Sequence, residues 1–140
     1  MNVEQLNAMT DLELDMKCAE IIGLTYSFFW SKHNYFSVTM PDGSNEIACR
    51  GWTAYDDTTG EKNKLPTEEQ AYLEVSDYHP TANTTEGKSA AFDLMVKYKL
   101  SITGYGKFVI DAANDITVDF GKITLQRAIV IAAILSAQEK

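Results

Sequence analysis

The stretch that most constrains the fold is the last one, residues 124–137 (TLQRAIVIAAILSA). Thr124 is a good N-cap residue, and no glycine or proline follows it, so a helix is expected over the whole stretch. Nearly every side chain in residues 128–135 is apolar. A helix on the surface would carry a polar face, so this one must be covered on more than one side. If Val130 or Ile134 were exposed in the monomer, we would expect that face to form a homodimer contact.

The composition indicates one soluble domain over residues 1–140. Of the 140 residues, 45% are hydrophobic, enough for a core of its own. The 20 acidic and 12 basic residues give a formal charge of −8, which argues against direct binding to nucleic-acid phosphates. The apolar run near the C-terminus is shorter than the roughly 20 residues that a membrane span needs. No signal-peptide pattern opens the chain, so we expect a cytoplasmic protein.

The first predicted helix begins at Thr10, because Thr10 and Glu13 fit a capping box. Gly23 is the expected stop, since glycine adopts the left-handed conformation that often follows a helix. The apolar face of this helix consists of Leu14, Cys18, Ile21 and Ile22.

Strand patterns follow. Residues 25–30 (TYSFFW) are rich in aromatic and β-favouring side chains. Residues 35–40 alternate, and the turn-forming segment 41–44 (PDGS) leads into a return strand over 46–50. The sequence therefore predicts a hairpin. On its return strand, the inward side chains would be Ile47 and Cys49.

The C-terminal half predicts a helix, three strands and the last helix. The helix spans residues 88–98, and the strands cover residues 100–102, 107–110 and 116–120. The expected fold is α/β (α+β), a compact domain with an antiparallel or mixed sheet covered by about three helices. In the helix over 88–98, the expected inward side chains are Ala91, Phe92, Met95 and Val96.

The middle of the chain is acidic. Residues 55–79 contain seven acids and two lysines, a net charge of −5. Residues 56–64 should form a loop. Two alternatives stay open beyond it: residues 65–69 could open a short helix, or residues 71–75 could alternate as a strand. We expect residues 55–79 to be a solvated, loop-rich excursion and the best candidate for a contact surface.

No pattern predicts a metal, a cofactor or catalysis. Zinc needs about four convergent ligands, and the spacing of His33, His79, Cys18 and Cys49 gives no such set. Nor does it pair Cys49 with either histidine as nucleophile and base. The segment 104–107 (GYGK) predicts a hairpin turn rather than a phosphate loop, because a strand follows it. The remaining polar cluster predicts ordinary turn formers: Asp111, Asn114 and Asp115.

Aromatic residues beside charges suggest a binding surface. Trp52 and Tyr55 stand at the start of the acidic segment, and aromatics of this kind often anchor partners; Trp52 is equally compatible with a place in the core. A small-molecule or nucleotide pocket is the alternative, lined by Trp30, Trp52, Tyr78 and Tyr105. For the favoured contact surface, the candidate residues are Trp52, Tyr55, Asp56, Asp57, Glu68, Glu69, Tyr78 and His79.

Three stretches resemble a family of small phage proteins. These are residues 9–24 (MTDLELDMKCAEIIGL), the segment YHPT at 78–81 with the following AFDLM at 91–95, and residues 125–133 (LQRAIVIAA). They are similar to the opening helix, central segment and closing helix of the phage ABA sandwich and NinX proteins. Together they cover about half the chain. Two features depart from the family: residues 81–84 lack its central tryptophan, and the acidic segment is longer.

The resemblance implies a three-layer α-β-α sandwich encoded by a phage or prophage. It implies no known activity. With the acidic middle, it predicts a non-enzymatic accessory protein in the cytoplasm of a bacterial host. Such a protein would bind a host or phage protein, for host takeover or against host defence.

Overall fold

The chain folds into two compact units. The computed structural model describes residues 1–30, 36–48, 67–103 and 107–139. Unit 1 combines Met1–Gly23 with Asp77–Lys140, and unit 2 is the intervening Leu24–Ser76. Each of these units has its own sheet and its own apolar core.

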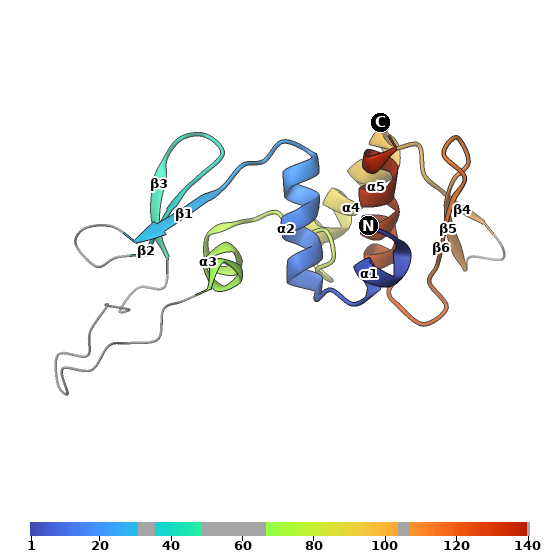
Figure 1. The fold of residues 1–140 in the computed structure, drawn as a ribbon, viewed down its shortest axis with the longest axis horizontal. Coiled ribbons are helices and arrows are strands. Elements are labelled where there is room, and N and C mark those ends of the chain that lie inside the picture. The colour runs from blue at the N-terminus through green and yellow to red at the C-terminus, as the bar shows by residue number, and fades with distance from the viewer. Residues whose placement is uncertain (31–35, 49–66, 104–106, 140) are drawn as a thin grey trace. The chain divides into compact units, whose positions relative to one another are not determined.

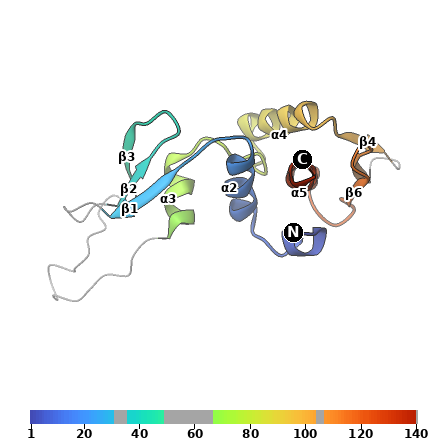
Figure 2. The same cartoon turned by 45° about the horizontal axis from the view of Figure 1, so that its top comes forward.

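Unit 1 is built around α5 (Leu125–Gln138), the helix predicted from the last stretch of sequence. It packs against a three-stranded antiparallel sheet and also contacts α1, α2 and α4 (Figures 1 and 2). Val130 and Ile134 are fully buried, so neither supplies an exposed face for a dimer. The other elements of the unit are α1 (Val3–Asn7), α2 (Asp11–Ile21), α4 (Thr85–Lys97), β4 (Ser101–Thr103), β5 (Phe108–Asp111) and β6 (Ile116–Asp119).

In unit 1, α5 lies between the sheet and α2, and α4 and α1 flank it on two other sides (Figure 2). β5 lies between β4 and β6. Val109 and Val118 are fully buried in the same core as α5, whereas Thr117 and Asp119 on the opposite face of β6 are exposed. The predicted α/β class with an antiparallel sheet is confirmed. Its helices cover one face of this sheet rather than both.

Helix caps explain where the helices of unit 1 begin. The Glu13 amide donates to Thr10 Oγ1 at 3.1 Å, and the Thr10 amide donates to Glu13 Oε1 at 3.3 Å. Thr124 Oγ1 likewise accepts from the Arg127 amide at 3.1 Å. Gly23 has a φ of 89°, as predicted for the residue that ends α2. These bonds satisfy amides that have no partner inside a helix.

Helix α4 corrects one prediction about inward residues. Ala91 is buried and Met95 packs against the core, but Phe92 and Val96 are 63% and 64% exposed. The predicted inward position of Phe92 and Val96 is wrong. The buried stripe of α4 runs through Ala91 and Leu94, so Phe92 and Val96 lie outside it. Apolar residues spaced four apart occur on both stripes of this helix, so the periodicity of the sequence alone does not show which stripe faces the core.

The described residues of unit 2 form a three-stranded antiparallel sheet and one helix, which packs on the sheet. The helix settles the alternative left open for residues 65–75. Thr67 and Gln70 form a capping box, with backbone-to-side-chain bonds of 2.8 and 3.2 Å. Phe36, Val38, Ala48 and Ala71 make the core. The elements are β1 (Ser27–Trp30), β2 (Phe36–Thr39), β3 (Asn45–Ala48) and α3 (Glu68–Val75).

The predicted hairpin is β2–β3, but its register differs by one residue. Thr39 pairs with Asn45, which leaves a five-residue loop rather than the four-residue turn predicted. A one-residue shift turns every side chain to the opposite face. Ile47 is consequently 43% exposed and Ala48 is buried, so the predicted inward position of Ile47 is wrong. Cys49 lies outside the described residues.

Candidate functional site

The residues predicted as a contact surface separate into two described pairs. Glu68 and Glu69 occupy the first turn of α3 in unit 2. Tyr78 and His79 belong to unit 1, in the segment between α3 and α4. The side chain of Trp30 lies outside the described part of the structure. So do the other residues predicted for the contact surface, the ligand pocket or a metal site. These remaining residues are Trp52, Tyr55, Asp56, Asp57, Tyr105 and His33.

The exposed side of α3 combines acids with one apolar residue. Ala71 and Tyr72 face the core, and Leu73 is 62% exposed. Glu69 lies four residues before Leu73, so both share one stripe of the helix. Glu68 and Glu74 are exposed beside them. We call these four residues, Glu68, Glu69, Leu73 and Glu74, the α3 acidic face.

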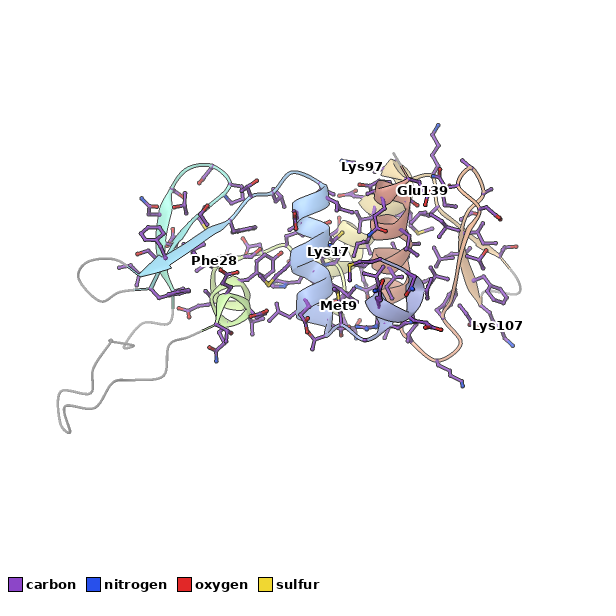
Figure 3. All side chains as sticks on the ribbon, in the orientation of Figure 1. Met9, Lys17, Phe28, Lys97, Lys107 and Glu139 are labelled. Carbon is purple, nitrogen blue, oxygen red and sulfur yellow. The ribbon has the colours of Figure 1, made fainter. Side chains whose placement is uncertain are left out.

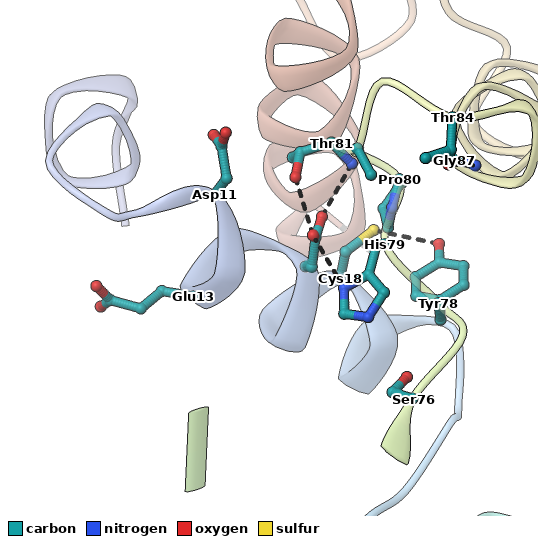
Figure 4. Close-up of polar contacts among 12 residues, drawn as sticks. Asp11, Glu13, Cys18, Ser76, Tyr78, His79, Pro80, Thr81, Thr84 and Gly87 are labelled. Atoms are coloured by element: carbon teal, nitrogen blue, oxygen red, sulfur yellow. Dashed lines mark hydrogen bonds and ion pairs between the residues drawn. The ribbon is translucent and has the colours of Figure 1, made fainter. Parts of the chain in front are cut away.

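His79 lies beside Asp15, a buried carboxylate of α2, and Tyr78 lies beside Cys18 of the same helix (Figure 4). Asp15 is only 3% exposed. Its carboxylate accepts from the Thr81 amide at 3.0 Å and from Thr81 Oγ1 at 2.9 Å. His79 Nδ1 lies 3.5 Å from Asp15 Oδ2. Burial raises the pKa of Asp15 above its ordinary value, although the Thr81 hydrogen bonds and the nearby His79 oppose this.

A carboxylate beside an imidazole also occurs in catalytic triads, which need an activated nucleophile as well. The nearest thiol in this region is Cys18, whose Sγ lies 3.5 Å from the Tyr78 hydroxyl. Burial raises the pKa of the Cys18 thiol to about 12. At neutral pH this sulfur is therefore a protonated thiol in the core, as predicted for Cys18, and not a thiolate nucleophile.

The segment after His79 is held on its other side by α4 and α5. Gln126 Nε2 donates to the carbonyls of Pro80 at 2.9 Å and Ala82 at 2.6 Å. A Cβ on Gly87 would lie 2.8 Å from the His79 carbonyl oxygen and closer still to that of Ala82. These contacts fix residues 79–82 against three helices. We therefore assign the Asp15 cluster a structural role.

A second polar cluster lies in the turn between β5 and β6. Asp111 is 2% exposed. Its Oδ1 accepts from the amides of Ala113 and Asn114 at 3.1 and 3.3 Å, and its Oδ2 from Asn114 Nδ2 at 2.6 Å and Ser136 Oγ at 2.7 Å. Burial raises the pKa of Asp111, but these hydrogen bonds outweigh it, so the pKa lies below its ordinary value. The turn prediction is confirmed.

Three polar residues that organise unit 1 are not predicted by the sequence patterns. Arg127 donates to Asp11 at 2.7 Å and to the backbone carbonyls of Leu6, Asn7 and Met9. For Asp15 the sequence does contain one sign of burial, because this carboxylate adjoins the apolar stripe of a predicted helix. The others carry no local signal, because their partners are distant in sequence. The three residues are Asp15, Gln126 and Arg127.

No protein-family model, curated protein or solved structure matches this chain. Within the described ranges, no three His, Cys, Asp or Glu side chains gather closely enough to hold a metal ion. No described helix has the length and apolar character needed to cross a bilayer.

Proposed function

We propose that this protein acts by binding another protein through the α3 acidic face. The observation that carries the proposal is Leu73, a leucine 62% exposed among glutamates. Interfaces commonly seat one apolar side chain in a pocket and surround it with polar groups. Carboxylates at the rim speed encounter with a positively charged partner and select against acidic ones. The partner should therefore be a basic protein surface with an apolar pocket.

The biological setting follows from the sequence resemblance. A phage or prophage accessory protein in the bacterial cytoplasm, directed at a host or phage protein, fits a small acidic chain. Host takeover or action against host defence would be a specialisation of the same binding. The proposed role is non-enzymatic, and it requires neither a metal nor a cofactor.

Capture from bacterial lysate at low and high salt tests the role of charge. The parent should retain a basic protein at low salt and lose it at high salt, because salt screens rim charges. Glu69→Gln should weaken capture at low salt and reduce its salt dependence. Glu86→Gln is the matched control, because Glu86 occupies the same position in the first turn of α4.

Equal capture by the Glu69→Gln and Glu86→Gln variants would contradict a role for the α3 acidic face. Capture that is independent of salt would also contradict it. Melting temperatures of both variants check that the helices remain folded, because an acid in the first turn contributes about 0.3–1 kcal/mol to helix stability.

A further inference from the structure

A depression in unit 1 lies where the C-terminal end of α4 meets the β5–β6 turn and α5. Its volume is about 470 Å³, within the range of about 300–1,000 Å³ typical of small-molecule sites. Lys97, labelled in Figure 3, belongs to this end of α4. The polar and aromatic residues that line the depression are Lys97, Tyr98, Lys99, Asp111, Asn114 and Ser136.

The carboxylate in this depression is already fully engaged. A carboxylate offers about four acceptor positions, and Asp111 accepts four hydrogen bonds from Ala113, Asn114 and Ser136. It therefore has little capacity to hold a cationic ligand. Its main role is to fix the turn that forms one wall.

The two lysines of the depression, Lys97 and Lys99, form no ion pair with a described residue. The ion pairs found among the described residues join His79 to Asp15 and Arg127 to Asp11, and neither involves Lys97 or Lys99. Lys97 Nζ lies 5.9 Å from the centroid of the Tyr98 ring. Two lysines thus line one depression, and neither has a carboxylate partner in the described part of the chain.

The backbone conformation at Lys99 is unusual for a residue with a side chain. Lys99 has a φ of 53° and follows the C-cap of α4. The Leu100 amide donates to the Met95 carbonyl at 2.9 Å, and the Lys99 amide to that of Val96 at 3.3 Å. This is a Schellman motif, whose left-handed position usually holds glycine because a Cβ is unfavourable there. Lysine at this position adds a second positive charge to the depression.

We propose that this depression binds a small phosphate-bearing molecule through Lys97 and Lys99. Paired ammonium groups suit the charge of a phosphate group, and the volume has room for an organic part. The competing explanation is that both lysines only offset the partial negative charge at the end of α4. The two explanations differ in what replacing each lysine does to binding.

Calorimetric titration with AMP, inorganic phosphate and citrate tests the proposal. AMP and phosphate should bind the parent, and citrate should bind more weakly. Lys97→Gln and Lys99→Gln should each weaken AMP binding about tenfold, as expected for loss of a hydrogen bond to a charged group. Lys88→Gln, an exposed lysine on the same helix, should bind like the parent.

Lys99→Gly separates ligand binding from helix capping. It should raise the melting temperature, because glycine suits this backbone conformation, and should weaken AMP binding as Lys99→Gln does. Three results would overturn the proposal: no binding of any probe at millimolar concentration, tighter binding of citrate than of AMP, or unchanged AMP affinity in the Lys97 and Lys99 variants. None of them bears on the α3 acidic face.

Discussion

Single residues in unit 1 have roles that their residue types do not suggest. Tyr78 and His79 are aromatic and polar, which made them candidates for a contact surface. In the structure they lie beside Cys18 and Asp15, in a segment held by α2, α4 and α5. Gly87 is part of the same packing, because a carbonyl occupies the space that a side chain would need.

Gly87→Ala should destabilise the protein although alanine favours helices. The gain from helix propensity is about 1 kcal/mol. Against it stands a Cβ only 2.8 Å from the His79 carbonyl oxygen, and forcing backbone apart in a packed core costs about 1–3 kcal/mol or more. Urea denaturation should show a net loss of stability. Ser89→Ala, at an exposed position of α4, is the control and should change stability little.

Asp111→Asn should lower stability at neutral pH by about 2 kcal/mol, because an amide nitrogen cannot accept the hydrogen bonds of one carboxylate oxygen. The pKa of Asp111 lies below its ordinary value in the folded state, so its stabilising effect is present above that ordinary value. It disappears as the pH falls through the lowered pKa. Stability curves of parent and variant should therefore converge in acid; a constant gap down to the lowest pH would contradict this assignment.

At the scale of elements, α5 determines how unit 1 is assembled. It contacts the sheet and the other three helices of its unit, and its N-terminal turn is joined to the connection between α1 and α2 through Arg127. Its central side chains have apolar neighbours on every side, so a cavity there cannot be filled by solvent. The stability of unit 1 should depend on this helix more than on any other element.

Ile131→Ala should reduce the free energy of unfolding by about 3 kcal/mol, the usual loss for an aliphatic side chain removed from a core. Ile131 is fully buried, whereas Leu125 on the same helix is 37% exposed. Leu125→Ala should lower stability by less than about 1 kcal/mol. Thermal denaturation of both variants provides the comparison, and similar losses would contradict the central position of α5.

The sequence predicts where the helices begin and end better than it predicts which side chains face the core. Thr10, Thr124 and Gly23 act through bonds within a few residues, so their roles are visible locally. The exposure of Phe92 and Ile47 depends on which stripe or register the rest of the fold selects. The contacts of Asp15 with Thr81, 66 residues away in sequence, depend on tertiary structure and could not be read from spacing.

At the scale of the whole molecule, unit 2 is a segment inserted between two parts of unit 1. This arrangement divides the predicted contact residues between a structural cluster in unit 1 and an exposed helix in unit 2. Within unit 2, Glu68, Leu73 and Glu74 are exposed and Glu69 is half-buried. We propose that these side chains bind a basic protein partner.

Comparing partner capture by the parent, Leu73→Ser and Leu125→Ser shows whether this surface binds the partner, which is the claim at stake. Both variants replace a solvent-exposed leucine, so both should fold. The claim predicts that Leu73→Ser loses the salt-sensitive partner while Leu125→Ser retains it at the parent level. Full retention of the same partner by Leu73→Ser would contradict the claim.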